Sequence, residues 1–256
     1  MGVDYVLFER ICELSGRFRP EGRRLMLGRQ SFRLEGGKIE RKYANALKRH
    51  GIAADVASLQ REDGFSEALW AGLGFGEMES MDFSKYEGAG IVHDLNKPVP
   101  PELLGQFGFI FDGGTLEHVF NVPQALDNVF HMLRPGGRFV SANGMNGWVG
   151  HGLYQFSPEL AWTYWGRTMG CKVHACLGIK KMPLRGGEPL VFPDPADSGK
   201  RLRLKGLIPE GRVYLYYEVE RLPTSAAGDI VLQSDYETLW HPHTNAGETR
   251  LDRQES

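Results

Sequence analysis

Hydrophobic residues recur along this chain in two spacings, which alternate and predict a succession of helices and strands. Apolar positions three or four residues apart indicate helices with one buried face. This spacing occurs within residues 1–20 and at residues 36–51, 65–73, 116–133 and 157–170. Short apolar runs that end in glycine or polar residues indicate buried strands. Such runs occupy residues 23–28, 78–82, 88–96, 107–114, 137–144, 171–179 and 213–219. Strands that alternate with helices predict an α/β fold, in which a mostly parallel sheet carries helices on both faces.

Two stretches lengthen this pattern without dividing it into separate domains. The link between the first two predicted strands is about 45 residues long, whereas a crossover needs only about a dozen, so we expect an insertion at about residues 29–76. Residues 180–212 are rich in Gly and Pro, and the alternating run at 201–205 predicts either a strand or an exposed basic arm. The sequence thus predicts one domain over residues 1–240 and a polar, poorly ordered tail over residues 241–256.

The overall charge changes the picture by excluding some classes of partner. The 256 residues include 30 Lys and Arg and 32 Asp and Glu, so no excess of positive charge favours nucleic acid or anionic lipid. The chain has no apolar run long enough to span a bilayer, and residues 1–10 lack the features of a signal peptide. We therefore expect a cytoplasmic protein with a small-molecule partner and with no nucleic-acid or membrane partner. The oligomeric state stays open, a homo-oligomer included.

The cysteines and histidines do not predict a structural metal site. Cys12, Cys171 and Cys176 form an odd set without paired spacing, which favours reduced, buried thiols over a disulfide framework. The His-Pro-His run at 241–243 resembles a metal site only superficially, because no third ligand stands near it in the sequence. We expect no bound metal.

The most specific motif lies between residues 111 and 139. A strand ends in Asp112, Leu-Glu-His-Val follows at residues 116–119, and a Leu-Arg-Pro-Gly-Gly turn follows at residues 133–137. This arrangement resembles the class I S-adenosylmethionine-dependent methyltransferases, in particular those of the ubiquinone-biosynthesis type (methyltransferase type 11-like). The resemblance implies a Rossmann-like, mostly parallel sheet of seven strands and S-adenosylmethionine as the cofactor.

The resemblance also implies which residues bind the cofactor. Asp82 ends the second strand, where the family places an acid on the ribose hydroxyls, and a carboxylate can accept both hydrogen bonds. Asp94 and Leu95 end the third strand and inherit a role at the adenine edge. The turn that lines the crevice beside them consists of Asp112, Gly113 and Gly114. Since Asp is common in turns, Asp82 and Asp94 are alternatively plain turn residues.

The turn after the first strand departs from the family. The family has an acid followed by alternating glycines, which let the backbone approach the ligand, whereas this chain has Leu-Gly-Arg-Gln-Ser at residues 27–31. Gly28 is therefore either a cofactor contact in a degenerate motif or only a turn residue. Arg29 is a candidate to close over the carboxylate of the methionine moiety.

Two histidines near the ends of the fourth and fifth strands are candidate general bases. His118 follows Glu117, which stands in the first turn of a helix that Thr115 can cap. His151 lies in a loop between glycines and aromatic residues. Both are expected near the crevice where open α/β sheets bind ligands. Either histidine could instead serve only local structure.

These observations favour a methyltransferase that uses S-adenosylmethionine and acts on a small-molecule acceptor, such as a sugar-like or hydroxyl-bearing compound. The alternative is a protein of the same fold that has lost catalysis and serves as a binding or structural partner, because fold alone does not fix function. The degenerate turn at Gly28 keeps this alternative open.

Overall fold

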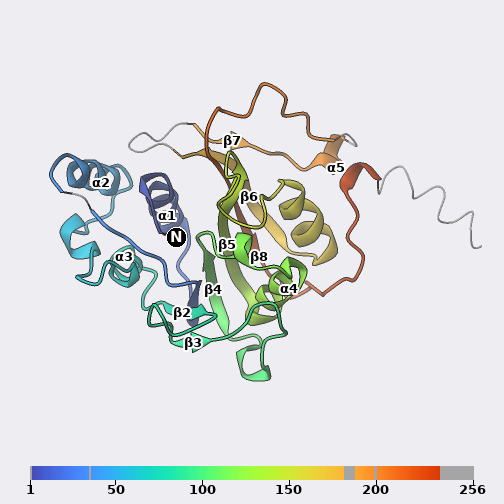
Figure 1. Cartoon of the computed structure of the whole chain (residues 1–256), viewed down its shortest axis with the longest axis horizontal. Helices are drawn as coiled ribbons and strands as arrows, with labels where there is room; N and C mark the ends of the chain where they lie inside the picture. Colours follow the sequence, from blue (N-terminus) through green and yellow to red (C-terminus); the bar gives the residue numbers. More distant parts are fainter. Residues whose placement is uncertain (1, 35, 182–187, 199–200, 237–256) are drawn as a thin grey trace, which may run out of the picture.

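The computed structural model describes residues 2–34, 36–181, 188–198 and 201–236 (Figure 1). Its centre is one eight-stranded sheet with the strand order β3-β2-β1-β4-β5-β8-β6-β7. The strands are β1 Arg23–Leu27, β2 Glu79–Asp82, β3 Ile91–Val92, β4 Phe107–Asp112, β5 Leu133–Asn146, β6 Lys172–Lys180, β7 Leu190–Val191 and β8 Val213–Glu220. All seven predicted strands are present, and the structure adds the short edge strand β7.

Helices and helical turns connect these strands, as the hydrophobic spacing predicted. The α-helices are α1 Tyr5–Arg17, α2 Lys38–Arg49, α3 Glu67–Gly72, α4 Val122–Met132 and α5 Pro195–Ser198. The shorter or irregular turns are η1 Val56–Leu59, η2 Pro101–Leu103, η3 Leu116–His118 and the π-helix η4 Leu160–Thr168. No helix in the described part of the chain is long and apolar enough to cross a membrane.

The sheet is parallel over its first five strands and antiparallel at its other edge. Strands β3, β2, β1, β4 and β5 pair in parallel, and β8, β6 and β7 pair antiparallel to their neighbours. The order 3-2-1-4-5 is that of a doubly wound sheet, in which the chain reverses direction across the sheet between β1 and β4. Such a sheet binds ligands beyond the carboxyl ends of its strands at this switch point.

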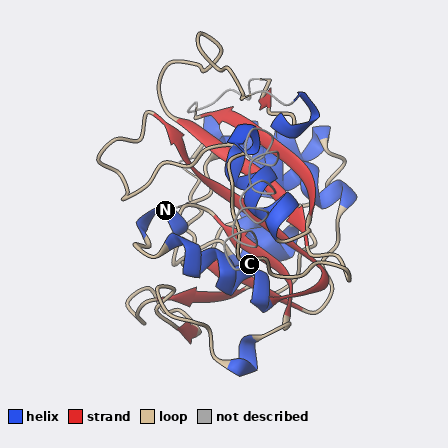
Figure 2. Cartoon of the chain, turned by 90° about the vertical axis from the view of Figure 1, so that its right-hand side faces the viewer, coloured by secondary structure: helices blue, strands red, loops and turns tan. Residues whose placement is uncertain are grey.

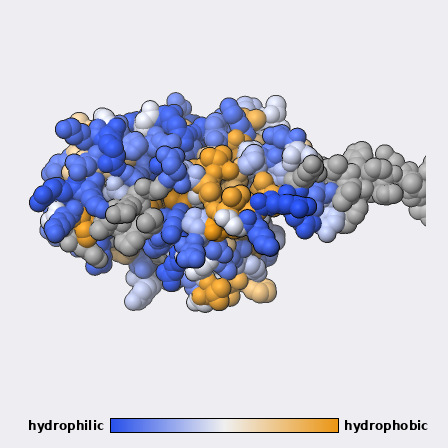
Figure 3. Space-filling view, turned by 90° about the horizontal axis from the view of Figure 1, so that it is seen from above, coloured by the Kyte–Doolittle hydropathy of each residue, from blue (hydrophilic) through white to orange (hydrophobic). Residues whose placement is uncertain are grey.

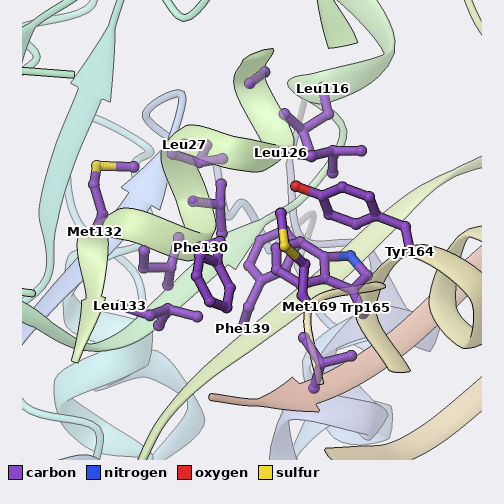
Figure 4. Close-up of a cluster of buried hydrophobic side chains, with 14 of the residues drawn as sticks. Leu27, Leu116, Leu126, Phe130, Met132, Leu133, Phe139, Tyr164, Trp165 and Met169 are labelled. Atoms are coloured by element: carbon purple, nitrogen blue, oxygen red, sulfur yellow. The ribbon is translucent and has the colours of Figure 1, made fainter. Parts of the chain in front are cut away.

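Helices cover both faces of the sheet (Figures 1 and 2). A hydrophobic core lies on each face. On one face, α1, α2 and α3 pack against strand residues such as Met26 and Phe109. On the other face, α4 and η4 pack against the alternate strand residues, such as Leu27 and Phe139 (Figure 4). Because successive strand residues point to opposite faces, both faces of a buried strand must be apolar. The view in Figure 3 is mostly hydrophilic, with apolar side chains gathered near its middle.

The predicted helix over residues 116–133 is wrong in its first part. Residues Leu116–His118 form only the short turn η3, and α4 begins at Val122. Pro123 lies in the first turn of α4, where its missing N–H leaves no helical hydrogen bond unmade. In the interior of a helix that began at Leu116 it would remove such a bond, so the regular helix starts at Val122. Thr115 does not cap, because its hydroxyl donates instead to the Leu27 carbonyl oxygen at 2.7 Å.

Residues 29–76, the predicted insertion, form a helical unit between β1 and β2. It contains α2, η1 and α3, and a bridge between Ser31 and Phe65 closes it at its base. Residues 201–205 form no strand, and they are not a free arm either: Arg201 and Arg203 are exposed, whereas Leu202 and Leu204 are half-buried and pack against the core beside α4 and η4. All three cysteines are free and buried, as expected. The predicted tail and the His-Pro-His run at 241–243 lie outside the described residues.

Candidate functional site

The turn after β1 lies at the switch point and is built tightly around Gly28. Gly28 has a φ of 67° and its amide donates to the Met81 carbonyl oxygen on β2 at 2.7 Å. A Cβ atom at this position would lie 2.5 Å from the Thr115 hydroxyl oxygen. The left-handed conformation and the close approach of Thr115 both require glycine.

Gln30 fills the space between the turns that follow β1 and β4. Its side chain is 1% exposed, and its amide nitrogen Nε2 donates to the Leu27 carbonyl oxygen at 2.9 Å. Its Oε1 atom points toward Gly113, where an added Cβ would lie 2.6 Å from it. Oε1 accepts no hydrogen bond from any residue that the structure describes. Gln30 Oε1 is therefore a buried acceptor without a donor in the expected crevice. The sequence motif does not predict it.

Arg29 lies against the insertion and not in the crevice. Its guanidinium pairs with Glu67 at 2.6 Å and with Asp63 at 3.0 Å. It also stacks over the Phe65 ring, 3.9 Å from the centroid. Two carboxylates neutralise the charge of this guanidinium. Their contacts also hold it away from the other predicted cofactor residues.

The acids that end β2 and β3 are placed at the carboxyl edge of the sheet. Asp82 is half-buried, and its Oδ1 accepts a hydrogen bond from the Phe83 amide at 2.6 Å. Asp94 accepts hydrogen bonds from the backbone and side chain of Asn96, which hold the pKa of its carboxyl below the usual value. Leu95 is buried, and its carbonyl oxygen accepts a hydrogen bond from Asn128 at 3.1 Å. Asp94 thus braces its own turn, and the Leu95 carbonyl oxygen ties this turn to α4.

Asp112 is fully buried beneath the turn after β4 and organises it. Its carboxylate accepts hydrogen bonds from the Thr115 amide at 2.7 Å, the Asn143 side chain at 2.5 Å and the Ser141 hydroxyl at 3.1 Å. The Gly114 amide adds a fourth donor at 3.2 Å. Burial raises the pKa of this carboxyl. These contacts support a positioning role for Asp112, which the structure places below the surface of the crevice.

Glu117 lies next to this network and is a second buried carboxylate. The Asn143 side chain joins the two, because it donates to Asp112 and its Oδ1 accepts from the Glu117 amide at 3.3 Å. Glu117 Oε2 accepts a hydrogen bond from the Gly144 amide on β5 at 2.5 Å. Burial raises the pKa of the Glu117 carboxyl to about 7. A carboxyl with such a strongly shifted pKa at a ligand-binding edge is typical of functional sites.

Both candidate histidines lie beside the other oxygen of Glu117. His151 Nε2 is 3.3 Å from Glu117 Oε1, His118 Nε2 is 3.8 Å from it, and the two ring centroids are 5.3 Å apart. Burial lowers the pKa of both imidazoles, which keeps them neutral at neutral pH. The structure therefore brings together the two predicted bases, from separate strand ends, around a carboxylate. We call Glu117, His118 and His151 the Glu-His-His cluster.

The loop that carries His151 folds back onto the backbone of Glu117. The amides of Leu153 and Tyr154 donate to the Glu117 carbonyl oxygen at 2.8 Å and 3.2 Å. The His151 amide donates to the Trp148 carbonyl oxygen at 3.0 Å, and the two rings are 4.9 Å apart. These contacts fix the position of the imidazole relative to Glu117.

The sequence pattern identifies Glu117 only as a first-turn acid and does not predict its place in the site. The available signal was a charged residue between the apolar positions Leu116 and Val119, directly before a histidine. Its 1% exposure depends on Gly144 and Asn143, which come from another strand. Two neutral imidazoles and a carboxylate can accept a proton or ligate a metal ion.

Replacing Gly144 by alanine is expected to destabilise the fold by about 1–3 kcal/mol, the usual cost of overpacking. An added Cβ would lie 2.8 Å from Trp148 Cγ and 3.0 Å from Glu117 Oε2. The free energy of unfolding in denaturant measures the effect. The matched control is Gly16→Ala in α1, where nothing lies within 4 Å and alanine should stabilise by about 0.5–1 kcal/mol. Equal effects of the two changes would contradict the close packing at Gly144.

A cavity adjoins the loop that carries His151. It has a volume of about 400 Å³, and its lining includes Gln155, Phe156, Leu160, Tyr164 and Val231. Gln155 also accepts a hydrogen bond from the Trp148 amide at 3.0 Å, which links the cavity wall to the loop. The volume lies in the range of small-molecule sites.

The comparisons with known proteins give matches among solved structures alone. No protein-family model matches the sequence, and no curated protein matches it. The trans-methyltransferase CalH in complex with SAH is 15% identical, with a TM-score of 0.41 over 83% of this chain, which spans only 55% of that one. A methyltransferase in complex with the Haloferax volcanii activator Trm112 is 14% identical, with a TM-score of 0.45 and coverages of 84% and 89%.

A third similar structure is a TehB-like SAM-dependent methyltransferase from Corynebacterium glutamicum. It is 14% identical, with a TM-score of 0.42 over 85% of this chain and 89% of that one. All three TM-scores lie below 0.5 and all three identities below 25%, which is too low to assign a fold, a family or a role to this chain.

Proposed function

We propose that this protein is an S-adenosylmethionine-dependent methyltransferase that acts on a small molecule with a hydroxyl acceptor. The observation that carries the proposal is the position of the Glu-His-His cluster: it lies at the ends of β4 and β5, next to the switch point between β1 and β4. Groups that take a proton thus stand beside the crevice where a doubly wound sheet binds its ligand.

The crevice residues fit the cofactor at two points. Gln30 Oε1 is a buried acceptor without a donor, and it suits the ammonium group of a methionine moiety. Asp82 has a carboxylate oxygen, Oδ2, that accepts nothing from the residues the structure describes; it suits a ribose hydroxyl. The cofactor supplies an electrophilic methyl group on a sulfonium. The task of the chain is then to orient an acceptor opposite the departing sulfur, and such alignment provides much of the rate.

The Glu-His-His cluster supports the acceptor side of the proposal. A hydroxyl acceptor has to lose its proton, and His118 or His151 can take it as a neutral imidazole. Glu117 holds one oxygen on the Gly144 amide and directs the other toward both rings, which orients them. The neighbouring cavity of about 400 Å³ suits the apolar part of an acceptor.

A protein of this fold without catalysis is the less favoured alternative. Purely structural sites rarely leave buried polar atoms without hydrogen bonds. Here Gln30 Oε1, Glu117 Oε1 and His151 Nε2 are buried and have no hydrogen-bond partner among the described residues, and all three lie at the carboxyl edge of the sheet. A ligand bound at this edge would supply the partners that these three atoms lack, although buried atoms without partners also occur elsewhere in the described residues.

Titration calorimetry with S-adenosylmethionine and with its demethylated product tests the proposal. At a hundredfold excess over the dissociation constant, a ligand adds about 2.7 kcal/mol of stability. In a domain of this size we expect the melting temperature to rise by several degrees, roughly 5–11 °C. If neither heat of binding nor a thermal shift appears at millimolar ligand, the alternative without catalysis becomes the better description.

Replacing Asp82 by alanine should weaken cofactor binding by about 1–3 kcal/mol, the scale of hydrogen bonds that involve a charged group. The reason is the loss of the free carboxylate oxygen at the end of β2. Calorimetry of the variant measures the effect, and Asp127→Ala on the exposed surface of α4 is the matched control. Parental affinity in Asp82→Ala would show that Asp82 is only a turn residue.

A further inference from the structure

We infer that the Glu-His-His cluster is a binding site for a divalent transition-metal ion, with Glu117 Oε1, His118 Nε2 and His151 Nε2 as its three protein ligands. Each of the three residues offers one ligand atom, and these three atoms all lie within 4.8 Å of one another. Two imidazoles and one carboxylate form a ligand set that proteins use for zinc and iron. The metal site depends only on the geometry of the cluster, so it does not require the proposed methyl transfer.

The spacing of the ligand atoms fits a metal ion. A tetrahedral ion with bonds of about 2.0–2.2 Å separates its ligand atoms by about 3.3–3.6 Å. Glu117 Oε1 and His151 Nε2 already stand 3.3 Å apart, and Glu117 Oε1 and His118 Nε2 stand 3.8 Å apart. The His118 side chain is 46% exposed, so its ring has room to close the remaining few tenths of an ångström.

Two of the three ligand atoms lack hydrogen bonds although they are buried. Glu117 Oε1 and His151 Nε2 have no hydrogen-bond partner in the part of the chain that the structure describes. The Glu117 side chain is only 1% exposed, so water does not readily supply the missing bonds. A buried acceptor that is left without a partner costs about 1–3 kcal/mol, and a metal ion between these atoms removes that cost.

The surroundings of the ligands are also those of a built site. Metal-bound carboxylates are held by hydrogen bonds to their other oxygen, and Glu117 Oε2 accepts from the Gly144 amide at 2.5 Å. The Glu117 backbone is fixed by Asn143, which in turn is held by Asp112. The His151 ring packs on Trp148, with the centroids 4.9 Å apart. Two of the three ligands are therefore held in place before any ion binds.

Three protein ligands leave at least one coordination position open, as catalytic metal sites do. The exposed side of His118 provides the way in for an ion and for a ligand. If the proposed methyl transfer is correct, a hydroxyl acceptor can occupy the open position, where the ion lowers its pKa. In that case His118 and His151 act as ligands and the ion activates the acceptor.

Metal-free protein, prepared by dialysis against a chelator, should bind one equivalent of Zn²⁺ in a calorimetric titration. Co²⁺ should bind at the same place and give the strong visible absorption of a four-coordinate ion. Glu117→Gln, His118→Gln and His151→Gln should each weaken Zn²⁺ binding by about tenfold or more, because even changes to residues behind the ligands cost this much. His118→Gln is the safest variant for folding, since its side chain is half-exposed.

The matched control is His131→Gln on α4. His131 Nε2 lies 3.4 Å from Asp127 Oδ1, but this pair has two members and is exposed. Unchanged affinity in His131→Gln, together with weakened binding in folded His118→Gln, supports the site. Failure of the parent protein to bind Zn²⁺, or equal binding by parent and His118→Gln, overturns it. Titration of S-adenosylmethionine into the metal-free protein reports on the proposed cofactor separately, so either proposal can fail alone.

Discussion

Replacing Asp112 by alanine is expected to lower the free energy of unfolding by about 3–5 kcal/mol, which is a large effect for one substitution. The carboxylate is 0% exposed and accepts hydrogen bonds from Ser141, Asn143 and the turn after β4. Alanine would leave these buried donors without acceptors, and each such donor costs about 1–3 kcal/mol. The melting temperature should fall by roughly 10 °C, as measured by calorimetry or circular dichroism.

Two further variants test the cause of this loss. Asp112→Asn keeps the shape and one acceptor oxygen, so it should recover part of the stability. Asp82→Ala removes an aspartate that ends a neighbouring strand but is only half-buried, and it should cost less than about 1 kcal/mol. A similar loss in Asp112→Ala and Asp82→Ala would show that the hydrogen-bond network around Asp112 contributes little.

Replacing His151 by alanine should lower kcat by about a hundredfold to ten-thousandfold while the affinity for the cofactor stays unchanged. The reason is that His151 lies at the end of β5 beside Glu117, on the acceptor side of the crevice. The loss is expected whether the imidazole takes the acceptor proton or holds a metal ion that activates the acceptor. The measurement is a methyl-transfer assay with an acceptor found by screening hydroxyl-bearing small molecules.

Comparison of variants isolates the role of the Glu-His-His cluster in turnover. His118→Ala should also lower kcat, and His131→Ala on α4 should leave it at the parental value. Activity that persists in metal-free protein and is lost in His151→Ala supports an imidazole base. Near-parental rates in both His118→Ala and His151→Ala would end the proposal that the cluster activates the acceptor, and alignment alone would then explain the rate.

The fold could be predicted from the sequence because the hydrophobic spacing is local and regular. Buried strands such as Phe107–Asp112 and Val213–Glu220 are short apolar runs with clear ends. The alternation of these runs with helical spacing is enough to specify an α/β sheet. The extra strand β7 has only two residues and depends on pairing with β6, so no local pattern predicts it.

The candidate site could be predicted only in part, because its central contacts join distant segments. His118 and His151 were both expected at the carboxyl edge, and the structure places them around one carboxylate. The burial of Glu117 depends on Gly144, which lies 27 positions further along the chain. Likewise, Arg29 is held by Asp63 and Glu67 of the insertion. A pattern read along one strand or helix contains none of these contacts.

The side chain of Gln30 has an entropic consequence for any ligand that binds between β1 and β4. It lies buried between the two turns, and the Leu27 carbonyl oxygen holds its amide group. A ligand that donates a hydrogen bond to Oε1 would meet an acceptor whose rotamer is already fixed. Little side-chain freedom would then be lost on binding, and this preorganisation favours affinity.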